Sequence, residues 1–199
     1  MKLFSRFSQV SDDEHLVYLS QQEVNFNVNQ PIHPANWHQY DTRLLMGMDT
    51  EDNSIWEKAC HILATYQFVP PEIMQVYFDE NLPLSERNLA LNSRFLFLKF
   101  RWAGRIARVI DEICETDAGS AQVFGCSYQT LESHFEQGEL TTEIWRYTAT
   151  NEVYFRMHAY SRVGQISNPI YRWTFPIALR FMRPYFVWRS LRRMKKLVK

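Results

Sequence analysis

The chain has 199 residues, of which 46% are hydrophobic and 15% aromatic, and its 22 Lys and Arg balance 22 Asp and Glu. A chain of this length can bury a core that needs no disulfide or metal staple, so we expect one domain over residues 1–199. The three cysteines show no paired spacing and are interpreted as small core thiols of a protein in a reducing compartment. No segment is apolar enough for a signal peptide or a spanning helix. We therefore expect a cytoplasmic protein, either free or peripheral at a membrane.

The charge is distributed unevenly along the chain. No Asp or Glu follows Glu152, and the segment after it holds eleven Lys and Arg. The first 152 residues carry the other 11 Lys and Arg against all 22 Asp and Glu, a net charge of −11. Such asymmetry indicates either an anionic partner for the C-terminal segment or a segment that lies against the acidic remainder of the chain.

The first 48 residues give weak structural signals. Leu16–Leu19 and Val24–Val28 are interpreted as short strands because they are apolar or alternate in polarity. Pro31, Pro34 and the polar residues around them indicate a loop.

The first strong element is a helix over Ser54–Tyr66. Ser54 and Glu57 have the spacing of a capping box, and apolar residues recur at helical intervals through the segment. Pro70 and Pro71 are predicted to end the helix.

The middle of the chain predicts an antiparallel sheet. Its segments are apolar or alternate in polarity and are joined by short connections, which favours pairing between neighbours. Gly104 is expected to separate two of the strands, and Ala149–Asn151 to form the turn of a hairpin. The predicted strands are Phe95–Trp102, Arg105–Ile113, Val123–Leu131, Leu140–Tyr147 and Val153–Ser161.

The C-terminal segment predicts a helix over Asn168–Lys199, with Asn168 as N-cap and Pro169 in the first turn. Pro176 and Pro184 are expected to kink or divide it. Its aromatic side chains are interpreted as a core-facing stripe. Residues 192–199 are too charged to bury and are expected to be flexible, although their cations would also be attracted to an anionic membrane surface, with nucleic acid the less favoured partner. These cations are Arg192, Arg193, Lys195, Lys196 and Lys199.

This order of elements predicts an α+β fold. We expect a curved antiparallel sheet packed on a long C-terminal helix, a helix-grip-like layout, with a shorter helix near residues 54–66. The concave side of such a sheet is a usual place for an apolar small-molecule pocket.

One segment has a recognisable pattern: Tyr128, Thr130, His134, Gly138 and Glu139 keep the spacing Y-G-T-L-x-x-H-x-x-x-G-E-E. This pattern resembles the signature of the uncharacterised family called Domain of Unknown Function nineteen-ninety, found in bacteria and plants. Residues 103–112, Arg156–Arg162 and the first predicted helix are similar to other parts of that family, so the resemblance covers about residues 40–199. The departures are Gln129, Leu140 and Val163, where the family has glycine, glutamate and proline.

The resemblance implies kinship with helix-grip folds of the START and Bet v 1 type, which bind lipids. It implies no catalytic residues, because the family has none that can be transferred to this chain. A shared fold does not by itself determine function.

The best polar constellation consists of Tyr128, Thr130, His134 and Glu139. These side chains have the chemistry to orient a ligand or to act as acid and base. The alternative is a structural one, in which their hydrogen bonds tie down the loop between Thr130 and Gly138.

A second set of polar residues follows the last predicted strand at period two. Arg156 and Arg162, with His158 and Tyr160 between them, would bind a carboxylate or phosphate if their face lines a groove. The alternative is a solvated outer face of the sheet. The chain lacks the Cys and His tetrad of a zinc site and the common nucleotide and hydrolase motifs, so we expect neither a metal nor a cofactor.

These observations favour a module that binds a hydrophobic small molecule or lipid between the sheet and the C-terminal helix. One alternative is an enzyme acting on such a ligand, with His134 and Glu139 as acid and base. Another is a protein that docks on a membrane or partner through its basic C-terminal segment.

Overall fold

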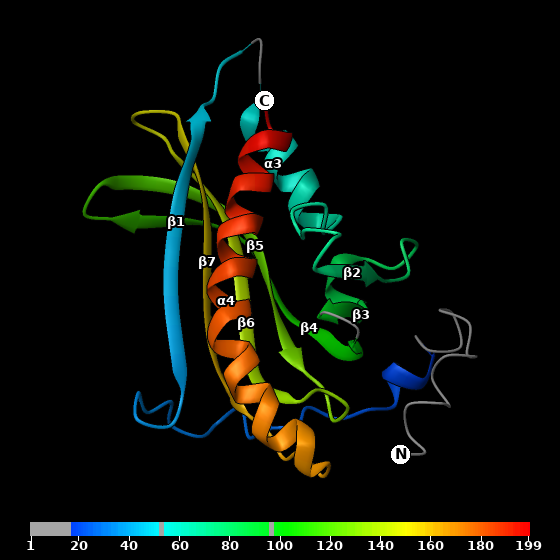
Figure 1. The fold of residues 1–199 in the computed structure, drawn as a ribbon. Coiled ribbons are helices and arrows are strands. Elements are labelled where there is room, and N and C mark those ends of the chain that lie inside the picture. The colour runs from blue at the N-terminus through cyan, green and yellow to red at the C-terminus, as the bar shows by residue number, and fades with distance from the viewer. Residues whose placement is uncertain (1–16, 52–53, 96–97) are drawn as a thin grey trace.

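Two layers make up the fold in the computed structural model, which describes residues 17–51, 54–95 and 98–199 (Figure 1). Across these residues, antiparallel strands form one 7-stranded sheet in the order β1-β7-β6-β5-β4-β3-β2. The long helix α4 (Pro169–Leu197) crosses the concave face of this curved sheet, and the shorter α3 (Ile55–Ala64) lies near its C-terminal end. The predicted α+β, helix-grip-like arrangement is therefore confirmed. The other elements are β1 (His38–Met48), β2 (Met74–Tyr77), η1 (Leu84–Glu86), β3 (Asn88–Phe95), β4 (Leu98–Thr116), β5 (Gly119–Thr130), β6 (Glu136–Tyr147) and β7 (Glu152–Val163).

The centre of the sheet follows the alternation of its sequence. In β7 the side chains of Val153, Phe155 and Met157 are fully buried, while those between them are partly exposed on the other face. The predicted hairpin between β6 and β7 is confirmed, and Asn151 turns the chain with a φ of 55°. Asparagine tolerates this left-handed conformation better than most residues.

The helix α3 is confirmed with its predicted cap. The Ser54 Oγ accepts a hydrogen bond of 3.1 Å from the Glu57 backbone N–H, and the buried stripe is Ile55, Ala59, Ile62 and Leu63. The helix ends at Ala64, where Tyr66 follows with a φ of 56°, so the chain leaves the helical path before it reaches Pro70.

Several expectations for the strands are wrong. Residues 17–20 form a helical turn, and Val24 makes only an isolated bridge to Leu131. The single strand predicted over Phe95–Trp102 is instead a hairpin, because Phe95 at the end of β3 pairs with Leu98 at the start of β4. An apolar run of this kind does not reveal by itself where the chain reverses.

Gly104 does not separate two strands, because β4 runs through it without interruption. A Cβ atom at this position would lie 2.8 Å from the Tyr128 ring on the neighbouring strand. The glycine therefore makes room for the Tyr128 ring within the sheet. Glycine is more often associated with turns, so the sequence did not indicate this packing role.

The helix α4 begins as predicted, since the Asn168 side chain accepts a 2.9 Å hydrogen bond from the Ile170 backbone N–H and Pro169 follows it. The helix continues through Pro176 and Pro184 to Leu197. Its last turns include residues 192–197, which belong to the segment predicted to be flexible, and Met194 and Val198 are fully buried.

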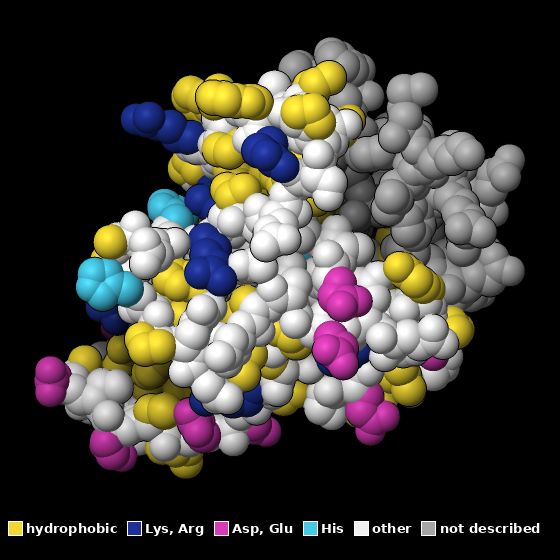
Figure 2. Space-filling view, turned by 90° about the horizontal axis from the view of Figure 1, so that it is seen from below, with side chains coloured by type: hydrophobic (Ala, Val, Ile, Leu, Met, Phe, Trp, Pro, Cys, Tyr) yellow, Lys and Arg dark blue, Asp and Glu magenta, His cyan; other side chains and the backbone are white. Residues whose placement is uncertain are grey.

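The aromatic side chains of α4 were expected in the core, and only some of them are. Phe175 is buried and Tyr171 and Phe186 are partly buried, but four others are exposed to solvent on a face of the protein that also carries basic side chains (Figure 2). The exposed ones are Trp173, Phe181, Tyr185 and Trp188. Of the three free cysteines, only Cys126 is buried.

Candidate functional site

A cavity of about 130 Å³ lies between the concave face of the sheet and the middle of α4. The helix is buried against the sheet side at one end through Phe175 and Leu179, and at the other through Ser190 and Met194. The side chains of α4 that line the cavity are the buried Phe175 and Leu179 and the partly buried Met182, Arg183 and Phe186. The apolar walls consist of Ile73, Met74, Leu140, Ala159, Leu179, Met182 and Phe186.

An ion pair lies at the edge of this cavity. Arg183 of α4 donates from Nε to the Glu136 Oε1 over 2.9 Å, and its Nη2 donates to the same oxygen. Both side chains are less than one fifth exposed. The positive charge of Arg183 and the negative charge of Glu136 therefore neutralise each other, and the pair adds no net charge to the cavity.

Two phenols from different strands share the cavity with this ion pair. Tyr40 of β1 and Tyr128 of β5 both line it. Burial, reinforced by the negative charge of Glu136, raises the pKa of each phenol well above its ordinary value. Both hydroxyl groups therefore stay protonated and are able to donate or accept a hydrogen bond.

His134 is the imidazole of the cavity, and its environment keeps it neutral. Its Nδ1 accepts a 2.9 Å hydrogen bond from the Glu136 backbone N–H, and its ring lies 4.7 Å from the Trp102 ring between centroids. Burial lowers the pKa of His134 to about 4, against the opposing effect of Glu136. Because Nδ1 is an acceptor, the proton of the neutral ring is on Nε2, which makes no hydrogen bond with the described residues.

Thr130 holds the loop that carries His134. Its Oγ1 accepts from the Gly138 backbone N–H over 2.9 Å and donates to the Asn25 Oδ1 over 2.7 Å. The Asn25 amide in turn donates to the carbonyl oxygens of His134 and Glu136. Thr130 therefore fits the structural interpretation, in which side-chain hydrogen bonds hold the loop in place. Its hydroxyl group both donates and accepts a hydrogen bond within the protein.

The other three candidate residues lie on the outer face of the sheet. The Glu139 carboxylate accepts hydrogen bonds from the Gln129 amide over 2.8 Å and the Tyr160 hydroxyl over 3.3 Å. Arg162 donates to Gln137 and lies over the Trp37 ring, 4.5 Å from its centroid. The structure thus brings Tyr128, Thr130 and His134 together at the cavity, and Glu139 also borders it, but the Glu139 carboxylate is held by Gln129 and Tyr160 and makes no hydrogen bond or ion pair with His134 among the described residues.

Arg156 belongs to a network of charges on that outer face. It donates to Asp41 over 2.6 Å and to Glu143 over 3.2 Å, and Glu143 also lies 3.5 Å from the His158 imidazole. Burial acts to raise the pKa of Glu143, but hydrogen bonds from His158 and Trp145 and the Arg156 charge outweigh it and lower the pKa. Each of these charged groups already has a partner within the protein.

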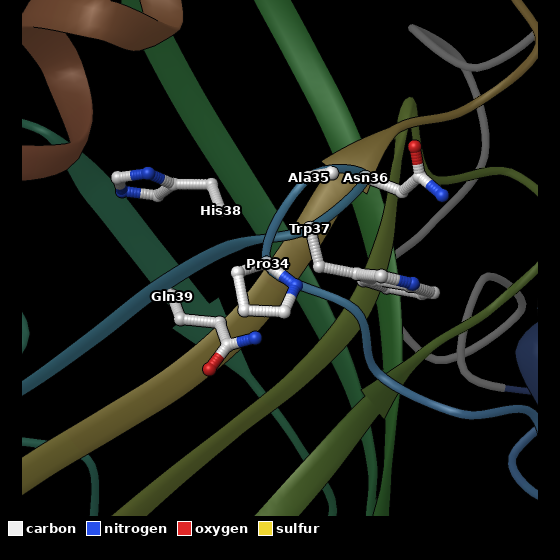
Figure 3. Close-up of a pocket in the computed structure, with 6 residues that line it drawn as sticks. All are labelled: Pro34, Ala35, Asn36, Trp37, His38 and Gln39. Atoms are coloured by element: carbon white, nitrogen blue, oxygen red, sulfur yellow. The ribbon is translucent and has the colours of Figure 1, made fainter.

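A second hollow, of about 450 Å³, lies open along residues 34–39 (Figure 3). All the residues that line it belong to one continuous segment, and Figure 3 shows His38 and Trp37 pointing to opposite sides. The Trp37 ring packs edge-on against Phe26 and Tyr160. Polar groups do not converge on this hollow from different elements, so we do not consider it a candidate ligand-binding site.

Three titratable side chains that line the cavity were not candidates from the sequence: Tyr40, Glu136 and Arg183. Glu136 lies inside the recognised segment, between His134 and Gly138, at a position that the family pattern leaves open, and Arg183 was considered only as one of the C-terminal cations. Tyr40 lies on β1, a strand that was not predicted. Within the described residues, no cluster of His, Cys, Asp or Glu is placed to hold a metal ion, and no helix is long and apolar enough to cross a membrane.

Comparison with known proteins gives one family match. Residues 20–193 match the family described as domain of unknown function (DUF1990), so the match begins earlier than the expected residue 40. None of the curated proteins matches the sequence.

Solved structures with a similar course of the chain are remote in sequence. A norcoclaurine synthase point mutant from Thalictrum flavum has a TM-score of 0.47 at 10% identity, over 81% of this chain and 94% of that chain. Ara h 8.0201 has a TM-score of 0.47 at 5% identity, over 81% and 97% of the two chains. Human STARD10 has a TM-score of 0.41 at 11% identity, over 94% and 81%.

Proposed function

The chain belongs to the family described as domain of unknown function (DUF1990), and we propose that it binds a hydrophobic small molecule in the cavity beneath α4. The ligand's apolar part would contact the walls formed by the sheet and α4. Its head would be an uncharged polar group, such as a hydroxyl or carbonyl, held by His134 and the two phenols.

The observation that carries this proposal is the incomplete packing between α4 and the sheet. The helix is buried at both ends of the interface, yet its middle leaves a cavity where the polar groups of the concave face converge. Small-molecule sites have this composition, with apolar walls and a few polar groups that fix orientation. A packed core with no ligand role usually leaves no such void.

The choice of an uncharged head follows from the charges at the cavity. Glu136 and Arg183 neutralise each other, and burial keeps the imidazole of His134 neutral. A carboxylate or ammonium group on the ligand would therefore be buried without a free counter-charge, which is costly. The Nε2–H of His134 is a suitable donor to a carbonyl or hydroxyl oxygen.

The size of the cavity indicates how the ligand would enter. A volume of about 130 Å³ suits a group about as large as one ring, whereas drug-sized ligands occupy roughly 300–1,000 Å³. A longer ligand would thus require α4 to move away from the sheet. Pro176 and Pro184 each remove a backbone donor from α4, which makes bending of this helix easier.

The test is native mass spectrometry of the purified protein, followed by solvent extraction of any retained molecule. In the variant Met182→Trp the larger side chain fills the cavity, and we expect the retained mass to be lost. Tyr185→Trp introduces the same side chain on the exposed side of α4 and should keep the mass.

Two results would contradict the proposal. The first is equal retention in Met182→Trp and Tyr185→Trp, which would place the molecule elsewhere. The second is a protein that is free of ligand as purified and that also fails to bind 1-octanol when the alcohol is titrated into it.

A further inference from the structure

A stripe of apolar side chains runs along the solvent side of α4. Trp173 is 78% exposed and Phe181 is 67% exposed, which is unusual for large apolar residues. The members of this stripe are spaced three or four residues apart, so they share one face of the helix over roughly 27 Å at 1.5 Å per residue. We call it the outer stripe, and it consists of Ile170, Trp173, Ile177, Phe181, Tyr185 and Trp188.

Basic residues continue this face toward the C-terminus. At 100° per residue, Arg192 and Lys195 fall on the same side of α4 as the outer stripe, and Lys199 follows just after the helix ends at Leu197. The Arg192 guanidinium lies over the Trp188 ring, 4.7 Å from its centroid, and so joins the two parts. One helix face thus changes from apolar at its N-terminal end to cationic at its C-terminal end.

The surroundings of this face contain no acidic residue from its own segment, because no Asp or Glu follows Glu152. Figure 2, which looks along α4 from its N-terminal end, shows hydrophobic and basic side chains gathered at the top of the view. The visible acidic side chains lie in the lower half of the same view. Among the described residues, the ion pairs of α4 join Arg183 to Glu136 and Arg189 to Glu72, and none joins Arg192 or Lys195 to a carboxylate.

We propose that the outer stripe and the following cations dock α4 on the surface of an anionic lipid bilayer. Helices that lie in a membrane interface combine aromatic and aliphatic residues with Lys and Arg, and Trp and Tyr prefer the headgroup level. The cations are attracted to acidic headgroups, while the apolar side chains enter the boundary of the acyl chains.

A second copy of the chain is a poorer fit to the same surface. A parallel pairing of two outer stripes would bring Arg192 and Lys195 of both copies together, and an antiparallel pairing would place these cations against the apolar Ile170 end of the other helix, in neither case facing a carboxylate from α4. The docking surface also does not depend on the proposed ligand site. Its side chains point away from the cavity, which is lined by the opposite side of α4.

The experiment is co-sedimentation of the full chain with vesicles of phosphatidylcholine alone and with vesicles holding about one quarter phosphatidylserine. We expect binding only to the second kind, and we expect it to weaken as salt screens the charges. The double variant Trp173→Gln/Phe181→Gln should reduce binding at least tenfold, because it removes two inserted rings. Ile113→Gln removes a side chain that is 72% exposed on β4 and should leave binding unchanged.

A charge variant tests the second half of the surface. Arg192→Gln/Lys195→Gln should weaken binding to the anionic vesicles roughly tenfold, whereas Arg108→Gln, at an exposed position of β4, should not. Glutamine is a good helix former, and circular dichroism would verify that each variant keeps its helices.

Three outcomes would overturn the proposal. One is absence of sedimentation with the anionic vesicles, and another is binding that persists in Trp173→Gln/Phe181→Gln. The third is a dimer seen by analytical ultracentrifugation that this double variant abolishes, since the outer stripe would then be an interface between two copies.

Discussion

The two faces of the sheet use polar side chains in opposite ways. On the outer face, Glu143 is 5% exposed and is contacted by Arg156, His158 and Trp145. On the concave face, His134 and Tyr128 stand beside a cavity, and the Nε2 of His134 has no partner among the described residues. The first arrangement satisfies buried charges within the protein. The second leaves hydrogen-bonding capacity for a molecule that enters the cavity.

This difference shows why residue type alone is a weak guide to a site. Arg156 was a candidate for its period-two spacing with Arg162 and Glu139 for its place in the recognised pattern, but the side chain of each is hydrogen-bonded to neighbours on the outer face. His134 differs from them in what surrounds it rather than in its chemistry. A free polar group next to a cavity is the more informative observation.

The largest expected effect concerns packing on the concave face. Phe155 is fully buried beside Phe68, so Phe155→Ala should destabilise the protein by about 3–5 kcal/mol through lost burial and a new cavity. Met182 already borders a void and is partly exposed, and Met182→Ala should cost no more than about 1 kcal/mol. Urea unfolding of the two variants measures both values. Equal losses would mean that the cavity is not present in solution.

The next effect is the pH dependence contributed by His134. The folded protein keeps this imidazole neutral down to about pH 4, while the unfolded chain takes up the proton near its ordinary pKa of 6.5. The unfolded state therefore binds more protons between these values, so the stability is complete above pH 6.5 and is lost as the pH falls toward 4. We expect the free energy of unfolding to fall by about 2 kcal/mol between pH 6.5 and pH 4. This is less than the whole pKa difference would give, because the imidazole borders a cavity.

The measurement is urea unfolding from pH 7 to pH 4 for the wild type and for His134→Gln. The variant should show a shallower loss of stability across this range. Identical curves would mean that the imidazole is already accessible to protons in the folded state.

A smaller effect tests the outer network. Glu143→Gln removes the charge that Arg156 and His158 share, and we expect a destabilisation of about 1–2 kcal/mol since those two partners are partly solvated. Asp41, whose side chain is 55% exposed, serves as the control, and Asp41→Asn should change stability by less than about 0.5 kcal/mol. Thermal unfolding of both variants at neutral pH would show the order. If Asp41→Asn were the more damaging change, the network would be organised around Asp41 instead.

The smallest effect on stability is expected at Tyr128. Its hydroxyl forms no hydrogen bond with the described residues, so Tyr128→Phe should alter the free energy of unfolding by less than about 0.5 kcal/mol. The same change should weaken binding of 1-octanol, whereas Tyr154→Phe on the outer face should not. A large loss of stability with unchanged binding would make Tyr128 a structural residue.

The sequence predicted those parts of the fold that depend on interactions between residues close together in the chain. The cap at Ser54, the cap at Asn168 and the alternation in Val153–Ser161 each act within a few residues, and the corresponding elements were found. The strand β1 was missed because it is an edge strand with few fully buried side chains. The reversal between Phe95 and Leu98 was missed because the sequence remains apolar through it.

The candidate site was predicted only where it is continuous in the sequence. Tyr128, Thr130 and His134 come from one segment, whereas Arg183 reaches Glu136 from 47 residues away. Which face a residue takes also depends on the register between strands, and the pairing of Gln129 with Glu139 places both on the outer side. Neither the distant partner nor the register can be deduced from a single sequence.

The most direct test of the central proposal is methyl NMR of the methionines during a titration with 1-octanol. Met74 and Met182 line the cavity, while Met194 is fully buried at the packed end of α4. We expect saturable shifts of the Met74 and Met182 methyl signals and an unchanged Met194 signal. Shifts that are absent, or equally large at Met194, would contradict a ligand site between the sheet and the middle of α4.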